Sequence, residues 1–324
     1  MVSHPDGPAE SNNRTQLDGR VWIAVPLRVV VDHRHGGRWT SLAGGGREWL
    51  WRGDSTGRDR VVPGDAFVDA GGLEECLPTV RGTPDHGSVW SRPWRTTGPD
   101  SAIVDCADFT LTRRITEESG AVVARYRLAA EPGYRFVWAA HALLDLSPAA
   151  RLVAPPGTPT RLYPEVADLL PPGTWRTGKP WHTAAWPDPA GLPLHRFGPD
   201  DGTALGAVLV GADDVLVVDG IDALRLRLHC PDQPRSTALW RNLRGWPEAA
   251  PYRSTGVEPM LGAVFDLAEA DLDPPPGGNA AVVPAGGEVG WELVVTAHRP
   301  ALPPHRPDGR SPGPGADRRS IRRD

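Results

Sequence analysis

The chain has 324 residues, of which 40% are hydrophobic and 23% are charged, and it contains 37 glycines and 36 prolines. The hydrophobic share can bury a core, so a fully disordered protein is excluded, and the glycine and proline content disfavours long helices. A net charge of −5 gives no electrostatic reason to bind nucleic acid or an anionic membrane surface.

Both ends of the chain are low in apolar residues. Residues 1–18 are polar and rich in Gly, Pro and Asn, which predicts a disordered tail. Residues 300–324 are rich in Pro and Arg and predict a second such tail. A single folded domain over 19–299 is therefore expected between them.

Three widely separated cysteines, Cys76, Cys106 and Cys230, are typical of reduced thiols and show no zinc-binding spacing. The N-terminus has no basic segment followed by an apolar run, so no secretion signal is expected. No run of roughly 18 apolar residues is present, so no membrane-spanning helix is expected either. These features predict a cytoplasmic protein.

Between the tails the dominant pattern is β. Hairpin turns are expected at 118–120 and 131–133, where the sequences Glu-Ser-Gly and Glu-Pro-Gly interrupt the strand-like runs. Only 264–270 has a helical pattern. The recurrence of short runs predicts an all-β sandwich or barrel. The strand-like runs are 21–31, a series within 101–145, 203–211, 214–230, 236–243 and 290–297.

The middle segment, 146–202, is dense in proline and tryptophan, which excludes a run of regular strands. A domain linker would be polar and poor in aromatics, whereas this segment holds Trp175, Trp181 and Trp186. We therefore expect ordered loops near a site rather than a linker.

The stretch 71–94 has side chains suited to a ligand. It mixes turn residues and acids with His86, Arg92, Trp90 and Trp94. Loops of this content often supply polar groups to a ligand, and the flat ring of tryptophan can pack on the C–H face of a sugar. A surface loop pinned by its aromatic residues is the structural alternative.

Two single residues stand out further along the chain. His141 lies in an apolar strand-like run, and Glu258 lies among small and apolar residues. Taken alone, the first fits a buried histidine and the second a solvated acid at a strand end, so composition does not join them. The sequence has no glycine-rich phosphate-binding loop, no serine nucleophile elbow and no zinc-binding pattern.

The chain resembles bacterial aldose 1-epimerase-like, or galactose mutarotase-like, proteins in five motifs that occur in the family's order. These are GGLEECLPTV…PDHGSVWSRPW, VWAAHALLDL, WRNLRGWP, GVEPMLGAVFDLAEA and PAGGEVGWELVVTA, and the resemblance extends over roughly residues 60–297. It implies an all-β fold, one large antiparallel β-supersandwich with few short helices. It also implies that a small-molecule sugar is held in a cleft on a concave sheet face.

The resemblance further implies interconversion of the α and β anomers of an aldose, with no cofactor and no metal. By matching motif positions, His141 would donate a proton to the ring oxygen, and Glu258 would remove the proton of the C1 hydroxyl. His86 would help to hold the sugar, and Arg92 would contact its hydroxyls or a charged substituent. Opening a hemiacetal needs one proton removed and one delivered, which suits a Glu and a His.

Two alternatives stay open. The first is a non-catalytic sugar-binding or sugar-sensing protein on the same fold, because well-studied mutarotases have an Asn before the histidine that acts as the acid, whereas Ala140 and Ala142 flank His141 here. The second is a lyase or hydrolase on a related sandwich. The sugar also stays open, including modified, acidic and phosphorylated sugars, as does the oligomeric state. Nucleic acid and membranes are not expected partners.

Overall fold

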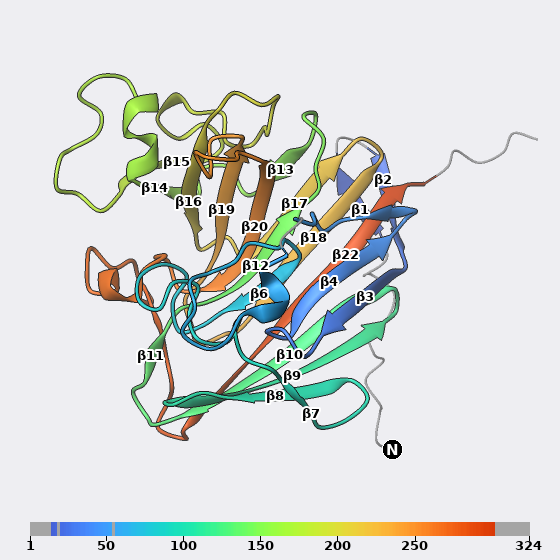
Figure 1. Ribbon diagram of the computed structural model, residues 1–324. Coiled ribbons are helices and arrows are strands. Elements are labelled where there is room, and N and C mark those ends of the chain that lie inside the picture. The colour runs from blue at the N-terminus through green and yellow to red at the C-terminus, as the bar shows by residue number, and fades with distance from the viewer. Residues whose placement is uncertain (1–13, 18–19, 54–55, 302–324) are drawn as a thin grey trace, which may run out of the picture.

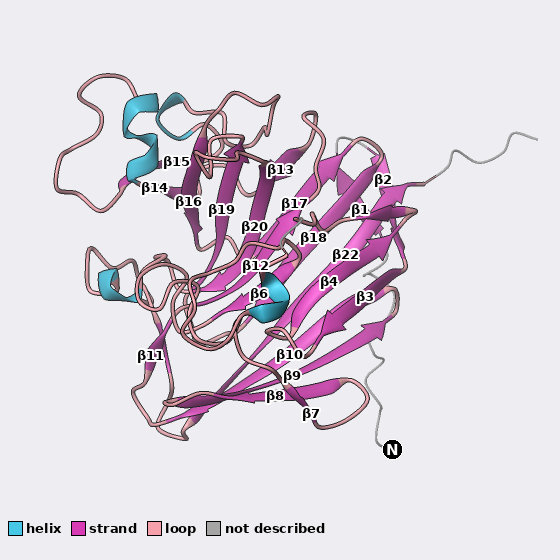
Figure 2. Cartoon of the chain, in the orientation of Figure 1, coloured by secondary structure: helices cyan, strands magenta, loops and turns pink. Residues whose placement is uncertain are grey.

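The computed structural model describes residues 14–17, 20–53 and 56–301, and strands predominate within them (Figures 1 and 2). Two ten-stranded antiparallel sheets share one large hydrophobic core within these described residues. The predicted all-β sandwich with few short helices is confirmed.

The first sheet is named the β22 sheet after its long strand, β22 (Glu288–Pro300). At one side β2 (Arg20–Val25) pairs with the end of β22, and β1 (Arg14–Leu17) pairs with β2. The other strands of the sheet are, in spatial order, β13 (Arg151–Val153), β17 (Asp214–Asp219), β18 (Asp222–His229), β22 (Glu288–Pro300), β10 (Ala121–Ala130), β9 (Phe109–Glu118), β8 (Ser101–Asp105) and β7 (Arg95–Thr96).

The second sheet is named the β20 sheet, and β5 (Arg47–Glu48) pairs with its strand β4. A separate two-stranded ladder joins β11 (Arg135–Phe136) to β21 (Ala281–Val282). The other strands of the β20 sheet are, in spatial order, β15 (His182–Ala185), β14 (Pro159–Leu162), β16 (Ala204–Val210), β19 (Arg235–Leu243), β20 (Arg253–Leu261), β12 (Trp138–Leu144), β6 (Leu73–Cys76), β4 (Arg38–Gly44) and β3 (Leu27–Asp32).

Helical structure in the described part of the chain consists of 3-10 turns, η1 (Arg58–Arg60), η2 (Pro164–Leu169), η3 (Pro189–Gly191) and η4 (Leu267–Glu269). The helical pattern at 264–270 is thus realised only as the short η4. The middle segment 146–202 is built from η2, η3 and short strands, and both Trp181 and Trp186 are buried in it.

The two predicted hairpin turns are present. Ser119 and Gly120 have φ angles of 51° and 85° between β9 and β10, and Gly133 has a φ of 86° after β10. A two-residue hairpin with positive φ at both positions matches the right-handed twist of its strands, and glycine adopts such a φ without steric cost.

Strand β12 divides its side chains between the two faces of the β20 sheet. Trp138, Ala140 and Ala142 belong to the core cluster between the sheets. Because successive residues of a strand point to opposite faces, His141 projects from the other face. That outer face, and not the core, is therefore where this strand can offer a polar group to a ligand.

A buried carboxylate joins the sheets beneath that face. Glu75, on β6, is fully buried and accepts hydrogen bonds from Arg113 Nη1 at 2.6 Å, from the Tyr126 hydroxyl at 2.9 Å and from Trp138 Nε1 at 2.8 Å. Arg113 and Tyr126 lie on β9 and β10, in the opposite sheet. The carboxylate of Glu75 and the guanidinium of Arg113 therefore neutralise each other inside the core.

The ends of the domain differ slightly from the predicted boundaries. Strand β1 lies inside the range 1–18, so strand pairing extends to Arg14. The remainder of that range and residues 302–324 fall outside the described residues. Among the described residues, no helix has the length and apolarity needed to cross a membrane.

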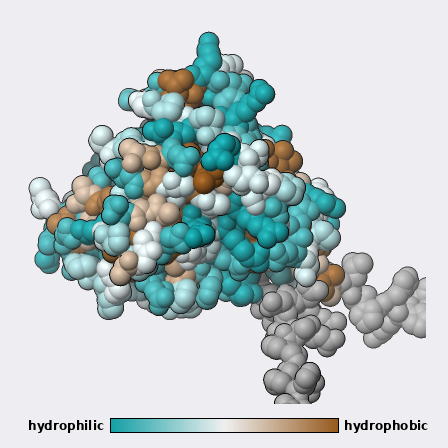
Figure 3. Space-filling model, turned by 90° about the horizontal axis from the view of Figure 1, so that it is seen from below, coloured by the Kyte–Doolittle hydropathy of each residue, from teal (hydrophilic) through white to brown (hydrophobic). Residues whose placement is uncertain are grey.

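The face of the molecule seen in Figure 3 is mostly hydrophilic, with its most hydrophobic residues in separate spots. Scattered exposed apolar residues of this kind are normal for a folded domain.

Replacing Glu75 by alanine should lower the free energy of unfolding by about 3–5 kcal/mol, because Arg113 would remain buried without its carboxylate. Chemical denaturation measures this change. The matched control is Glu117→Ala, which removes the exposed partner of Arg28 and should cost far less. Equal losses for the two variants would contradict the role given to Glu75.

Candidate active site

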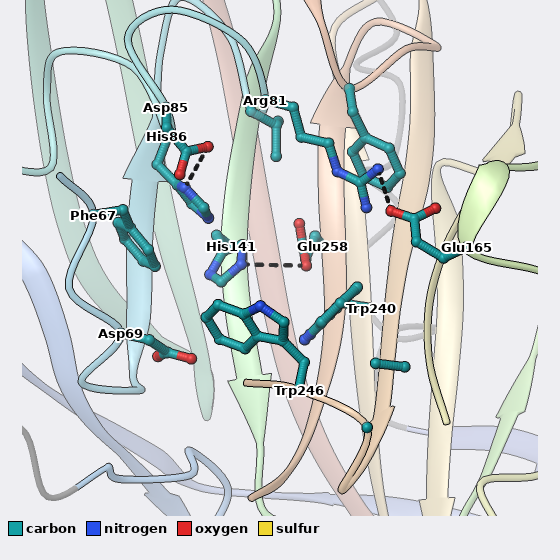
Figure 4. A pocket seen from close by; sticks show the side chains of 14 residues that line it. Phe67, Asp69, Arg81, Asp85, His86, His141, Glu165, Trp240, Trp246 and Glu258 are labelled. Carbon is teal, nitrogen blue, oxygen red and sulfur yellow. Dashed lines mark ion pairs between the residues drawn. The ribbon is translucent and has the colours of Figure 1, made fainter. Parts of the chain in front are cut away.

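A pocket of about 640 Å³ opens on the outer face of the β20 sheet (Figure 4). Its floor is formed by strands β12, β19 and β20, and its rim by the loops around β6, the loop after β19, and η2. A volume of this size suits a small organic ligand. The lining residues are Phe67, Asp69, Val80, Arg81, Asp85, His86, His141, Glu165, Ala204, Trp240, Gly245, Trp246, Glu258 and Phe265.

Strand register brings His141 and Glu258 together. In the antiparallel β12–β20 ladder, Ala139 pairs with Met260 and Leu143 with Gly256, so His141 stands opposite Glu258 between these pairs. Directly opposite residues of antiparallel strands point to the same face. Nε2 of His141 lies 3.7 Å from Oε1 of Glu258, and the two side chains share the pocket floor (Figure 4).

Glu258 is a buried acid with few polar contacts to offset the cost of burying its charge. Its side chain is 2% exposed, and its Oε2 has no hydrogen-bond partner among the described residues. Burial raises the pKa of the Glu258 carboxyl above its usual 4.5, and the nearby His141 only partly offsets this. Oε2 is therefore available to accept a proton from a ligand hydroxyl.

The backbone leaves room for this carboxylate at a glycine. A Cβ built on Gly256 would lie only 2.3 Å from Oε1 of Glu258 and 3.0 Å from Cβ of Trp240. The Glu258 side chain therefore occupies the space over Gly256, which requires that this position have no side chain.

His86 is held in a tight loop at the rim. Its φ is 58°, and its backbone N–H donates to the Val80 carbonyl at 2.9 Å. The imidazole stacks on Phe67, with ring centroids 3.5 Å apart, and meets the His141 ring edge-on at 5.0 Å. Oδ1 of Asp85 lies 3.1 Å from Nδ1 of His86, close enough to form an ion pair when the imidazole is protonated.

The protonation of His86 is set mainly by its burial. Burial lowers its pKa from the usual 6.5, and the Asp85 carboxylate opposes that shift without cancelling it. A neutral imidazole at pH 7 has one ring nitrogen free to accept a hydrogen bond.

Two tryptophans form a wall beside the pair. The Trp240 and Trp246 rings meet edge-to-face at 6.3 Å, and both line the pocket. Buried Asn242 holds the loop between them: its Oδ1 accepts from the backbone N–H groups of Gly245 and Trp246, and its Nδ2 donates to the Trp246 carbonyl at 2.8 Å. Apolar ring faces of this kind suit the C–H face of a sugar.

The pocket's arginine is already paired. Nη1 of Arg81 lies 2.6 Å from Oε1 of Glu165 on η2, and its guanidinium packs over the rings of Tyr163 and Phe265. A Cβ on Gly206 would lie 2.6 Å from Arg81 Nη2. The arginine is thus confined by packing below and by an ion pair at its tip.

Asp69 stands at the opposite side of the pocket (Figure 4). Its Oδ1 accepts from the Gly71 backbone N–H at 3.0 Å, and its Oδ2 accepts from the Tyr252 hydroxyl. The Tyr252 ring stacks on Trp51 with centroids 4.8 Å apart. The carboxylate is therefore fixed in position, with lone pairs still available to a ligand.

The structure brings three of the predicted site residues into one pocket, namely His86, His141 and Glu258. It does not bring the other three there. Trp90 is buried behind Phe67, with its carbonyl accepting from Arg58, and Trp94 lies in the core under the Arg113 guanidinium.

Arg92 is half-buried and lies outside the pocket lining, near Cys106, whose thiol it influences electrostatically. We therefore leave Trp90, Trp94 and Arg92 out of the proposed site. Trp90 and Trp94 belong to the same loop as His86 but are buried away from the pocket, and Arg92 lies between them in the sequence.

Several lining residues were not singled out from the sequence. Trp240 and Trp246 fall inside the WRNLRGWP motif, which could have drawn attention to them. Phe67, Asp69 and Arg81 lie in irregular loops, where no periodicity separates a site residue from a solvated one. Among the described residues, no group of three or more His, Cys, Asp or Glu is arranged to hold a metal ion.

No family model matches the chain, and no curated protein matches its sequence. Solved structures do match. The Slr1438 protein of Synechocystis sp. PCC 6803 has a TM-score of 0.59 at 14% identity, over 92% of this chain and 99% of that one. A candidate aldose 1-epimerase of Escherichia coli K12 has a TM-score of 0.59 at 14% identity, over 85% and 98%. A galactose mutarotase-like protein of Lactobacillus casei ATCC 334 has 0.56 at 16% identity, over 86% and 100%.

The chain has the galactose mutarotase-like fold. This confirms the fold that the five motifs predicted. In the galactose mutarotase-like fold of this chain, the pocket lies on the strand face that presents His141 and Glu258.

His86 should titrate, in an NMR experiment on its ring protons, with a midpoint below 6.5, because burial disfavours the imidazolium. In Asp85→Asn the midpoint should fall further, since the lost carboxylate favours the charged ring. Asp108→Asn, which removes an exposed charge outside the pocket lining, is the control. A midpoint at or above 6.5 would contradict the burial argument.

Proposed function

We propose that this chain is an aldose 1-epimerase-like isomerase, which interconverts the α and β anomers of a sugar. The observation that carries the proposal is the pair on the pocket floor, His141 Nε2 3.7 Å from Glu258 Oε1, with Glu258 Oε2 unpartnered within the described residues. The fold shared with a candidate aldose 1-epimerase and a galactose mutarotase-like protein supports it.

The proposed reaction needs two proton transfers. Glu258 takes the proton of the C1 hydroxyl, while protonated His141 delivers one to the ring oxygen O5. The C1–O5 bond breaks and a C1 carbonyl forms. Rotation about C1–C2 presents the other carbonyl face, and closure returns each proton with the roles reversed. Since O1 and O5 are bonded to the same carbon, two groups lying side by side can serve both oxygens.

The environment of Glu258 suits a general base. A carboxylate with an ordinary pKa is a weak base near neutral pH, and the burial that raises the pKa of Glu258 makes it a stronger one. Its position on a strand, packed over Gly256, also fixes the direction of the proton transfer.

The remaining residues bind rather than react. The neutral His86 imidazole can hydrogen-bond to the sugar near its ring oxygen, because it stands beside His141. Trp240 and Trp246 offer apolar faces to the ring carbons. This assigns recognition to the rim and walls, and chemistry to the floor.

A sugar-binding protein without catalysis is the second candidate. The aromatic wall of Trp240 and Trp246 favours it, because stacking on a sugar needs no acid or base. Binding without acceleration of anomerisation would select this reading over the first.

Glu258→Gln should keep the fold and slow anomerisation by roughly 10²–10⁴-fold, because the amide cannot accept the O1 proton. Polarimetry or NMR on freshly dissolved pure anomers measures the rate. In the wild type the rate should fall on the acid side with a midpoint above 4.5, since a raised pKa protonates the base at higher pH. Glu117→Gln is the control, and an unchanged rate in Glu258→Gln would overturn the mechanism.

Gly256→Ala tests the placement of the base without changing its chemistry. The added methyl group would overlap Glu258 Oε1, so the carboxylate must move, and a displacement of about 1 Å can cost on the order of 10²-fold in rate. Gly286→Ala is the matched control, because nothing lies within 4 Å of a Cβ there. Wild-type rates in Gly256→Ala would show that the observed carboxylate position is not needed.

A further inference from the structure

The charged side chains around the pocket are predominantly acidic. Among the described residues that line it, Asp69, Asp85, Glu165 and Glu258 are acidic, and Arg81 is the one arginine or lysine. Protonated His141 and ionised Glu258 cancel each other in the proposed mechanism. The pair of Arg81 with Glu165 also cancels, which leaves the carboxylates of Asp69 and Asp85 in excess.

An anionic ligand finds no unpaired cation among these lining residues. A phosphate or carboxylate group at Arg81 would have to share the guanidinium with Glu165, whose Oε1 lies 2.6 Å from its Nη1, and would bring a second negative charge beside Glu165 at the rim. His86, the other basic group at the rim, is kept from charging by its burial. The pocket therefore disfavours the acidic and phosphorylated sugars that the sequence left open.

Of the two carboxylates in excess, Asp69 is the better placed to contact a ligand. The Gly71 N–H and the Tyr252 hydroxyl fix both of its oxygens, so its orientation costs no further ordering. Its charge contributes to the raised pKa of Glu258, so the two groups are close enough to interact electrostatically. Asp85 is instead 54% exposed and faces His86, where solvent screens it.

Two further features of the pocket suit an ammonium group. Although the Glu258–His141 pair has no net charge in the proposed mechanism, Oε2 of the buried Glu258 is an acceptor without a partner among the described residues. The faces of Trp240 and Trp246 form a wall of the same pocket. Indole rings attract cations, so the wall and the carboxylates favour the same charge.

We propose that the sugar held in this pocket is an amino aldose, whose ammonium group is recognised by the Asp69 carboxylate. This rests on the proposed function, because it takes the occupant to be an aldose. Asp69 acts as a specificity-determining residue, and Tyr252 as the residue that positions it.

The test compares sugars that differ only in this group. Glucosamine, galactosamine and 6-amino-6-deoxyglucose are measured beside their neutral parents, the N-acetyl forms of the two 2-amino sugars, and glucose 6-phosphate. The full-length protein is used at a pH where the amino group is protonated. Both the anomerisation rate and the dissociation constant by calorimetry are measured, so that binding and catalysis are read separately.

At least one amino aldose should be preferred over its neutral parent by roughly ten- to hundredfold in kcat/KM and in affinity, the range of one charge-assisted hydrogen bond. An N-acetyl form should lose that preference, and glucose 6-phosphate should bind more weakly than glucose. In Asp69→Asn the ratio of amino to neutral sugar should fall close to one. In Tyr252→Phe, which keeps the ring but frees Asp69, it should fall partway.

Asp108→Asn is the charge-matched control and should keep the wild-type ratio. Acceleration of neutral aldoses with no amino preference would overturn this inference and leave the isomerase proposal standing. Preferred binding of an amino aldose without any acceleration would overturn the isomerase proposal and support the charge selectivity. Tighter binding of glucose 6-phosphate than of glucose would overturn the inference directly.

Discussion

The register between β12 and β20 is the constraint on which the rest of the site depends. It sets His141 on β12 directly opposite Glu258 on β20. Because directly opposite residues point to the same side of a sheet, both side chains face outward from the β20 sheet. A shift of one residue in this pairing would send His141 into the core and expose its apolar neighbours. Burial of the apolar residues of the two strands thus stabilises this register, and the register places His141 beside Glu258.

The ion pairs beneath the site explain how such a face can be rigid. Glu74, next to His141 in the β6–β12 ladder, is buried and bonded by Arg58, whose Nε lies 2.9 Å from Oε1 of Glu74. Glu75 faces the other way and binds Arg113 inside the core. Two consecutive glutamates therefore connect β6 to Arg58 on one face of the sheet and to Arg113 on the other. Neither could leave its arginine without exposing an unpaired buried charge.

Much of the fold could be read from the sequence, because alternation and turn residues are local signals. The Ser119–Gly120 hairpin is an example. His141 and Glu258 could also be picked out, as polar residues in apolar runs, but only the resemblance joined them. Which strands become neighbours depends on pairing between distant segments, and no local pattern records it.

The loop residues were harder to assign for a related reason. Trp90 and Trp94 have the composition of a sugar site, yet they pack into the core, because composition does not reveal which way a loop turns its rings. Asp69 and Arg81 line the pocket but follow no period. Their partners, Tyr252 and Glu165, lie far away in the sequence, so only the folded chain identifies them.

The pair of Arg81 and Glu165 has a consequence for traffic into the pocket. It links η2 to the loop that follows β6, while Val166 anchors η2 in the core. An incoming anion would compete with Glu165 for the arginine, whereas a neutral or positively charged ligand would leave the ion pair intact. The charge of the ligand and the arrangement of side chains at the entrance are therefore linked through this one contact.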